Sequence, residues 1–298
     1  MSKQKAILSW VLFFLVITGV SFFLTSWMIP KESGRLEQTV SKQTKATNQK
    51  KTIHYVAIGD SLTQGVGDET KQGGFVSLVA DKIKDNYQLK AVHAQNEGVA
   101  GERSDQILKR INQNTSLQKE ISQADFLTAT FGGNDLLKVI EKNFLSLSVK
   151  KIEKSETAYQ KNSEALLARL RELNPTAPIY VLGIYNPFYL NFSEITALQT
   201  VVDNWNDATE QVVKEQKNMY FIPINDLLYK GLNSQVGVTK STTSDSQSSS
   251  SAATSNSIEN NALYEGDKFH PNSIGYQIMA KAVRNELIAT KSHWLIKE

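Results

Sequence analysis

The chain has 298 residues, of which 40% are hydrophobic and 21% charged, and it contains no cysteine. This composition is typical of a globular protein, and the lack of cysteine excludes disulfides, iron–sulfur clusters, thiolate zinc sites, a cysteine nucleophile and cysteine lipidation. The first 52 residues carry eight basic and two acidic side chains, and the other 246 residues carry 25 basic and 28 acidic ones. The body is therefore mildly acidic and lacks the clustered basic face of nucleic-acid-binding proteins, so we expect it to bind no nucleic acid.

An apolar run without any charge extends from residue 6 to residue 30. A helix of this length exceeds the roughly 30 Å hydrocarbon core of a bilayer. Trp10 and Trp27 lie toward its two ends, as interfacial aromatic residues tend to do. We interpret residues 6–30 as a transmembrane signal-anchor that follows a cytoplasmic tail, residues 1–5. A cleaved signal peptide is the alternative, but its apolar core is usually about 7–15 residues long and ends at a small-x-small site, which this run lacks.

Residues 31–52 are polar and have no periodic apolar pattern, so we interpret them as a stalk. Lys3 and Lys5 favour an N-terminus inside the cell, whereas the basic residues on the other flank make the positive-inside rule equivocal. We expect a single-pass protein of the cell membrane, with the body of the chain, residues 53–298, on the extracellular side.

Short β-rich runs alternate with longer segments of helical periodicity throughout this body. Strands are predicted at residues 53–58, 89–94, 126–131, 179–184 and 220–222. Helices are predicted at residues 75–87, 104–112, 156–173, 194–216 and 273–290. This alternation predicts a parallel sheet covered by helices on both faces, with the active site beyond the carboxyl ends of the strands.

A Ser/Thr-rich segment, about residues 237–260, interrupts the alternation. Of the 19 residues from Thr239 to Ser257, 13 are Ser or Thr, and none is part of a periodic apolar pattern. Such a segment is expected to be disordered. We favour a tolerated surface insertion, and the alternatives are a mobile flap over the site or a modified segment.

Three loops after predicted strands carry groups suited to acyl chemistry. The first strand leads into Gly59-Asp60-Ser61, which would place a serine hydroxyl at its carboxyl end. Gly101 follows the second strand and offers a backbone N–H for an oxyanion, and Asn134 follows the third and offers a neutral side-chain N–H donor. Each of these loops, taken alone, is also typical of an ordinary turn, or of a helix cap at Asp135 in the third case.

A fourth pattern, Asp267-x-x-His270, precedes the last predicted helix. A serine hydroxyl is a weak nucleophile and needs a base that removes its proton. His270 could be that base and later the general acid, with its imidazole oriented by Asp267 through Nδ1. The remaining histidines, His54, His93 and His293, lie in strand-like runs or near the C-terminus, and we interpret them as structural.

The ordered set of Ser, Gly, Asn and Asp-x-x-His resembles the SGNH, or GDSL-type, hydrolase family. Within it, the chain is similar to membrane-associated lipase/acylhydrolase-like proteins of Gram-positive bacteria. The resemblance runs from about residue 53 to the C-terminus and implies a three-layer α/β/α, flavodoxin-like fold. It implies that Ser61 is the nucleophile and first oxyanion donor, that Gly101 and Asn134 are the other donors, and that Asp267 and His270 complete the triad.

The resemblance implies a serine ester hydrolase that forms an acyl-enzyme and needs no cofactor. The expected partners are an ester or acylated substrate, such as a lipid or a cell-wall glycan, and the membrane. One departure from the family is Phe269, where many relatives have a smaller or aliphatic residue, and it could narrow the pocket. A membrane-tethered binding module without activity is the alternative. A metal site at Asp267 and His270 lacks a third ligand at suitable spacing, and Gly65-x-Gly67 lacks the spacing of a dinucleotide loop.

Overall fold

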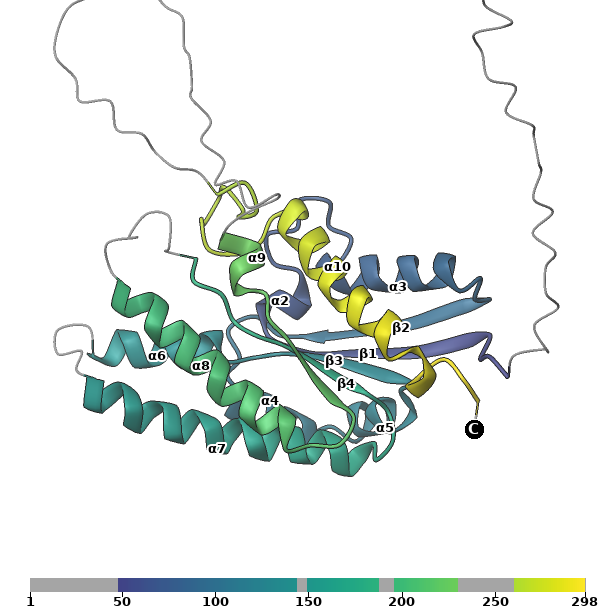
Figure 1. The fold of residues 1–298 in the computed structure, drawn as a ribbon, viewed down its shortest axis with the longest axis horizontal. Helices are drawn as coiled ribbons and strands as arrows, with labels where there is room; N and C mark the ends of the chain where they lie inside the picture. The colour runs from purple at the N-terminus through teal and green to yellow at the C-terminus, as the bar shows by residue number, and fades with distance from the viewer. Residues whose placement is uncertain (1–47, 144–148, 188–195, 230–259, 298) are drawn as a thin grey trace, which may run out of the picture. The chain divides into compact units, whose positions relative to one another are not determined.

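The body of the protein is built on a single sheet of five parallel strands (Figure 1). A computed structural model describes residues 48–143, 149–187, 196–229 and 260–297. The strand order is β2-β1-β3-β4-β5. The strands are β1 Thr52–Gly59, β2 Ala91–Gly98, β3 Phe126–Thr130, β4 Ile179–Leu182 and β5 Met219–Ile222. The predicted parallel sheet is therefore confirmed.

Helices cover both faces of the sheet, which gives the three-layer α/β/α architecture expected from the sequence. Figure 1 shows α3 and α10 on one face, and α4, α5, α7 and α8 on the other. The helices of the described residues are α2 Ser61–Gln64, α3 Gly74–Asn86, α4 Ser104–Gln113, α5 Thr115–Gln123, α6 Gly133–Asn143, α7 Val149–Leu173, α8 Thr196–Lys214, α9 Asn225–Tyr229, α10 Ser273–Ala289 and a short 3-10 helix, Lys291–His293.

Strand β1 shows how the sheet separates two hydrophobic cores. Tyr55 and Ala57 point into the core under α3 and α10, whereas Val56 and Ile58 point into the core under α4, α5, α7 and α8. Both faces of the strand are thus buried, which explains its nearly continuous apolar sequence. Val56 and Ile58 each contribute about 1.5–3 kcal/mol when fully buried.

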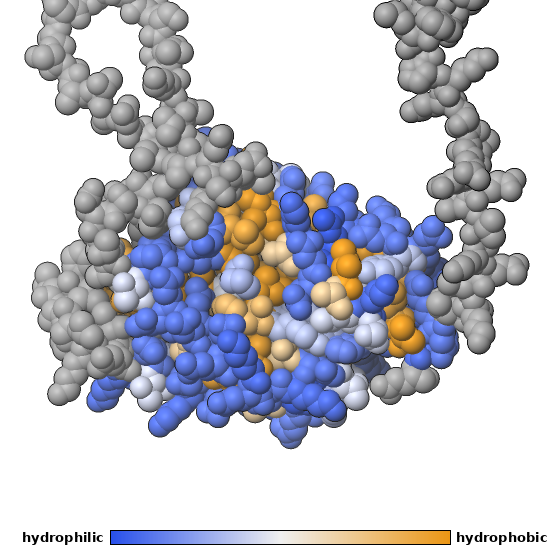
Figure 2. All heavy atoms as spheres, viewed as in Figure 1, coloured by the Kyte–Doolittle hydropathy of each residue, from blue (hydrophilic) through white to orange (hydrophobic). Residues whose placement is uncertain are grey.

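The edge strands are less completely covered than the centre of the sheet. Most of β2 is partly or fully exposed, and two of the four residues of β5 are half-buried. Figure 2 shows hydrophilic residues over much of one face of the molecule, with a hydrophobic strip between α8 and α10. The deeply buried backbone is therefore that of β1, β3 and β4.

The strand order brings the loops after β1, β2 and β3 together at the carboxyl ends of the strands. The chain passes from β1 to β2 on one side and then crosses to β3 on the other, so β1 lies between them. At the carboxyl end, Gly59 is paired with Gly98 on one side and with Thr130 on the other. A crossing of this kind opens a crevice beyond the strand ends, where ligands of α/β proteins bind.

Several predicted boundaries differ from those observed. Strand β2 begins at Ala91 and continues to Gly98 instead of ending at residue 94, because its polar residues lie at an exposed sheet edge and lack an apolar pattern. Helices α2, α5, α6 and α9 were not predicted. The Gly-Gly-Asn-Asp sequence suggested a turn or a cap at Asp135, but α6 begins at Gly133, inside it.

The predicted N-terminal segments lie almost entirely outside the described residues. They are the tail (residues 1–5), the signal-anchor (residues 6–30) and most of the stalk. The Ser/Thr-rich segment also lies outside the described residues, up to residue 259. Within the described ranges, no helix is both long and apolar enough to cross a bilayer. Residues 48–52, assigned to the stalk from sequence, belong to the folded unit, where Lys50 pairs with Asp125 at 2.6 Å.

Candidate active site

Ser61 is the first residue of α2 and directly follows the β1 turn. Only 7% of its surface is exposed. Because it begins the helix, its backbone N–H has no intrahelical acceptor and remains available to a ligand. The turn is tightly packed, since a Cβ on Gly59 would lie 2.2 Å from Thr130 Oγ1. Only glycine fits there, which explains the residue that precedes Asp60-Ser61.

The buried Asp60 carboxylate holds this turn in place. It caps α2 by accepting a hydrogen bond from Leu62 N at 3.0 Å, and it accepts a second from Thr130 Oγ1 at 2.8 Å. Thr63 Oγ1 lies 2.8 Å from the same threonine oxygen. Burial raises the pKa of the Asp60 carboxyl, and the hydrogen bonds only partly oppose this effect. Asp60 thus ties the Ser61 turn to the end of β3.

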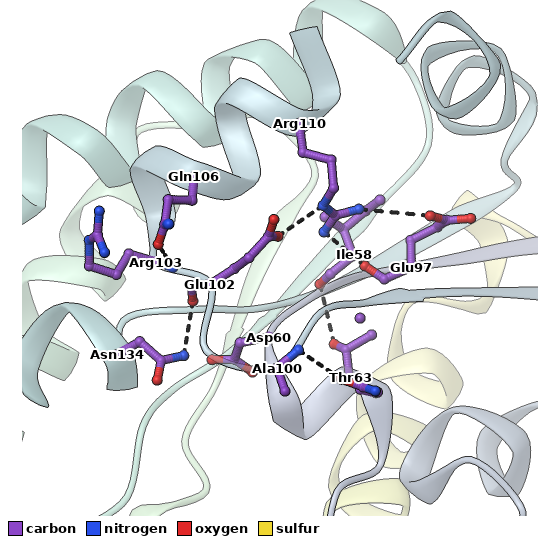
Figure 3. A network of polar contacts seen from close by, with 12 residues as sticks. Ile58, Asp60, Thr63, Glu97, Ala100, Glu102, Arg103, Gln106, Arg110 and Asn134 are labelled. Atoms are coloured by element: carbon purple, nitrogen blue, oxygen red, sulfur yellow. Dashed lines mark hydrogen bonds and ion pairs between the residues drawn. The ribbon is translucent and has the colours of Figure 1, made fainter. Parts of the chain in front are cut away.

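The two further oxyanion donors predicted from sequence lie on neighbouring segments. Asn134 is in the first turn of α6, and its Nδ2 donates to the Glu102 carbonyl at 2.9 Å (Figure 3). Gly101 has a positive φ of 81°, and a Cβ there would meet nothing within 4 Å. Its N–H makes no hydrogen bond to any residue that the structure describes. Both residues therefore keep an N–H that a ligand can use.

Asp135 is beside Asn134 but has a different role. Its carboxylate accepts hydrogen bonds from Ser104 N at 3.0 Å and from Ser104 Oγ at 2.7 Å. Burial raises the pKa of Asp135, although these bonds lower it. The hydrogen bonds between Asp135 and Ser104 hold the start of α6 against the start of α4. Asp135 therefore supports the site without presenting its carboxylate to a ligand.

Asp267 and His270 form the pair that the sequence predicted. His270 Nδ1 lies 2.6 Å from Asp267 Oδ2, while Asp267 Oδ1 accepts the backbone N–H groups of Phe269 and His270, each at 2.9 Å. Burial acts to raise the pKa of Asp267, but the hydrogen bonds from His270 and Phe269 outweigh it, and the pKa lies below its ordinary value. Asp267 therefore stays ionised and fixes the imidazole ring through Nδ1.

Ser61 and Asn134 line one cavity of about 40 Å³. The cavity is lined by Asp60, Ser61, Leu62, Gly133, Asn134, Ile184, Tyr185 and Phe269. Phe269 forms part of its wall, as expected for a residue that narrows the pocket, and its backbone carbonyl accepts the Tyr185 hydroxyl at 2.5 Å.

A second cavity of about 40 Å³ adjoins the first and is almost entirely apolar. The two share Gly133, Ile184, Tyr185 and Phe269. The other lining residues come from α6, from the segment after β4 and from α8: Leu136, Leu137, Ile140, Asn186, Pro187, Leu198, Val201 and Val202. We call this second cavity the apolar slot. It extends the Ser61 cavity between α6 and α8.

The five predicted site residues are not all joined in the structure. Gly101 and His270 are not among the residues that line the Ser61 cavity. Within the described ranges, no hydrogen bond links Ser61 Oγ to the His270 ring. Catalytic hydrogen bonds are often long before substrate binds. The histidines interpreted as structural lie elsewhere: His54 and His93 on adjacent strands, and His293 bonded through Nδ1 to Tyr220 at 2.7 Å.

Sequence reasoning missed residues that support the site. Thr130 joins Asp60 to β3, and the Glu102 carbonyl anchors Asn134. Tyr185 lines both cavities. Only Thr130 left a signal in the sequence, as the second of two threonines in a mainly apolar strand and the residue at its end. Backbone carbonyls and the residues that contact them leave no such signal.

Comparison with known proteins identifies the family of the chain. Residues 57–278 match the GDSL-like Lipase/Acylhydrolase family. The chain is 36% identical to the uncharacterized protein YpmR of Bacillus subtilis (strain 168), over 85% of this chain and 87% of that protein. It is 24% identical to the spore germination lipase LipC of Bacillus licheniformis, over 78% of this chain and 95% of that protein.

Among solved structures, the lipase Lip_vut3 from a goat rumen metagenome is similar in fold, with a TM-score of 0.61 at 23% identity. The similarity covers 78% of this chain and 96% of that chain. The family match extends from β1 into α10 and includes the Ser61 turn, the segments with Gly101 and Asn134, and the Asp267–His270 pair. The resemblance seen in the sequence is thereby confirmed, and the protein belongs to the GDSL-like lipase/acylhydrolase family.

Proposed function

We propose that the protein is a serine ester hydrolase that acts through an acyl-enzyme. The observation that carries the proposal is the shared cavity of Ser61 and Asn134, which places a hydroxyl and an amide donor around one space. The hydrogen bond between Asp267 and His270 supports it, because a ring fixed through Nδ1 keeps Nε2 as the atom that can exchange a proton with a serine.

In the proposed reaction, Ser61 Oγ attacks the ester carbonyl carbon while His270 Nε2 takes the hydroxyl proton. The oxyanion that forms accepts hydrogen bonds from the N–H of Ser61, the N–H of Gly101 and Asn134 Nδ2. His270 then gives its proton to the leaving alcohol, and the acyl group stays on Ser61. A water molecule, deprotonated by His270, attacks the acyl carbon, and His270 then returns the proton to Ser61 Oγ as the bond to the acyl group breaks and the acid leaves. Each oxyanion donor of this kind stabilises the transition state by about 2.7–4 kcal/mol.

The apolar slot is evidence that the group bound next to the reacting carbonyl is an apolar acyl chain. The slot begins at Gly133, beside the amide of Asn134, and continues between α6 and α8. The leaving alcohol must stay near His270, which protonates it, and His270 does not line the slot. We therefore assign the slot to the acyl part of the substrate and the His270 side to the alcohol part.

Ester hydrolysis by matched variants tests the proposal. Full-length protein in detergent should hydrolyse p-nitrophenyl esters. Ser61→Ala should lower the rate at least about 1,000-fold, because the nucleophile is lost. The control is Ser122→Ala, since Ser122 lies on the exposed side of α5. Equal rates for wild type and Ser61→Ala would contradict the proposal, and rates no higher than without protein would favour the binding-module alternative.

We also propose that residues 6–30 anchor the protein in the cell membrane, with the folded unit outside. The support is the uncharged apolar run in the sequence. The anchor would bring membrane lipids and cell-wall glycans within reach of the site. Protease added to intact cells should then digest the folded unit. A folded unit that survives until the cells are lysed would contradict this orientation.

A further inference from the structure

The Arg110 side chain spans the loop that carries Gly101. It is 20% exposed and reaches from α4 toward the end of β2 (Figure 3). Its Nε donates to the Glu102 carboxylate at 2.9 Å, and its Nη2 donates to the Glu97 carbonyl at 3.0 Å. Its Nη1 lies 3.7 Å from the Glu97 carboxylate. One guanidinium group thus holds both ends of the segment from residue 97 to residue 102.

This segment controls both predicted oxyanion donors outside the nucleophile turn. Gly101 directly precedes Glu102, so the position of its N–H depends on the Glu102 backbone. The carbonyl of Glu102 accepts one N–H of Asn134 Nδ2 at 2.9 Å. That bond fixes which way the amide is turned and leaves the second N–H for the cavity that Asn134 lines. A shift of Glu102 would therefore move both donors together.

The backbone of this loop is permissive at Gly101, and the Arg110 contacts add to two backbone hydrogen bonds, from Val99 N to the Gly59 carbonyl at 2.9 Å and from Glu102 N to the Val99 carbonyl at 3.2 Å. Gly101 adopts a positive φ, which only glycine adopts at little cost, and glycine is also the residue with the most conformational freedom. Gln64 Oε1 holds the first half of the loop by accepting Ala100 N at 2.7 Å. On the second half, the Glu102 side chain is held by Arg110. A planar guanidinium can make both contacts at once, whereas a lysine ammonium is a single point charge.

We propose that Arg110 is a positioning residue for the oxyanion-binding donors Gly101 and Asn134, acting through Glu102. It touches neither substrate nor the reacting atoms. This inference rests on the proposed function, because the donors matter only if an oxyanion forms. Its kinetic consequence is a loss in kcat with KM nearly unchanged, since the oxyanion exists in the transition state and not in the bound ester.

The first test compares Arg110→Gln with Arg169→Gln in the full-length protein. Arg169 is a matched control because it is 24% exposed, pairs with Glu172 at 2.7 Å and contacts the far end of α4 through Asn112. We expect Arg110→Gln to lower kcat about tenfold, since small misplacements of catalytic groups cost one to two orders of magnitude. Arg169→Gln should leave kcat unchanged. An unchanged kcat in Arg110→Gln would overturn the inference.

A double-mutant cycle separates positioning from general destabilisation. If Arg110 acts through the donors, Arg110→Gln should lower kcat by less than about threefold in an Asn134→Ala background, because one donor is already absent. Equal fold losses in both backgrounds would overturn the inference. If Arg110→Gln does not fold, Arg110→Lys replaces it in the same cycle and should show a smaller loss of the same kind. Full activity of Arg110→Lys would overturn the inference as well.

Hydrogen exchange gives a readout that does not depend on activity. By mass spectrometry, the peptide spanning residues 97–103 should exchange faster in Arg110→Gln than in wild type and should be unchanged in Arg169→Gln. Equal exchange in Arg110→Gln and wild type would overturn the inference. If wild type shows no hydrolysis that depends on Ser61, the proposed function fails, while the exchange experiment still reports whether Arg110 tethers the loop.

Discussion

Asp60 lies next to Ser61, the proposed nucleophile, and is buried, with its carboxylate accepting hydrogen bonds from Leu62 N and Thr130 Oγ1. Burial holds its pKa above the ordinary value. As pH rises from the unfolded-state pKa through the raised folded-state pKa, the folded protein binds more protons than the unfolded chain, so this group lowers stability with rising pH. Above its unfolded-state pKa, this carboxyl therefore destabilises the folded protein relative to a group that does not titrate.

Asp60→Asn should consequently gain stability over wild type as pH rises. The amide oxygen can still accept the two hydrogen bonds, and the variant has no charge to bury. Urea unfolding of both proteins at pH 4 and pH 8 measures this, and the difference in free energy of unfolding should favour the variant more at pH 8. A difference that is the same at both pH values would show that Asp60 does not titrate abnormally.

Glycine residues at the site illustrate what single positions reveal in the sequence. Gly59 and Gly101 both follow predicted strands, and a glycine in that place suggests a tight turn or a close backbone approach. The reasons differ: Gly59 faces Thr130, whereas Gly101 needs a positive φ in open space. The sequence pattern indicates that both positions require glycine. The structure distinguishes the two reasons, because Gly59 packs against Thr130 of β3 and Gly101 does not pack against a strand.

At the scale of elements, α6 and α8 determine the size of the apolar slot, the proposed acyl site. Both helices contribute apolar side chains to the slot, and α6 also carries Asn134 at its start. A helix that holds an oxyanion donor at one end and slot residues one to two turns later couples the reacting carbonyl to the acyl chain. Substrate preference should therefore respond to side-chain volume on α6.

Leu137→Trp tests this by filling part of the slot. If the larger ring keeps two methylene groups of an octanoyl chain in water, at about 0.8 kcal/mol each, the ratio of kcat/KM for octanoyl over acetyl p-nitrophenyl ester should fall about 15-fold. The acetyl ester is the internal control, because its acyl group is too short to enter the slot. A ratio equal to that of wild type would exclude the slot as the acyl site.

Helices with a regular apolar stripe were predicted best and short helices worst. The helices α3, α4 and α10 lie close to their predicted bounds because each buries such a stripe, and the interior strand β1 does so because both of its faces are buried. The helices α2 and α9, of four and five residues, are too short to show a period. Helix α6 is concealed by a glycine-rich start, and β2 by an exposed edge that tolerates polar residues.

At the scale of the whole molecule, the site depends on the crossing of the chain from β2 to β3. Segments centred on Ser61, Gly101 and Asn134 reach the same sheet edge because β1 lies between the other two strands. The sequence order of these segments, with Asp267-x-x-His270 after them, identified the family. It could not reveal the apolar slot or the Arg110 tether, because both arise from contacts between elements distant in sequence.

The loop that carries His270 is held by hydrogen bonds between residues close to it in sequence. Tyr264 N donates to the His270 carbonyl at 2.7 Å, and Asn272 caps α10 by accepting Ile274 N at 2.9 Å. Asn272 Nδ2 also donates to the Leu263 carbonyl at 3.0 Å. These bonds fix the Asp267–His270 pair at the start of α10, so the chain after the Ser/Thr-rich segment returns to the body in a defined conformation.

The central claim is that His270 activates Ser61 for attack, and covalent labelling measures it most directly. Full-length wild type, His270→Ala and Ser61→Ala are each treated with a fluorophosphonate, and the modified peptides are identified by mass spectrometry. We predict a phosphonyl adduct on Ser61 in wild type, at least about 100-fold slower labelling in His270→Ala, and none in Ser61→Ala. Labelling of Ser61 at the same rate with and without His270 would contradict the account.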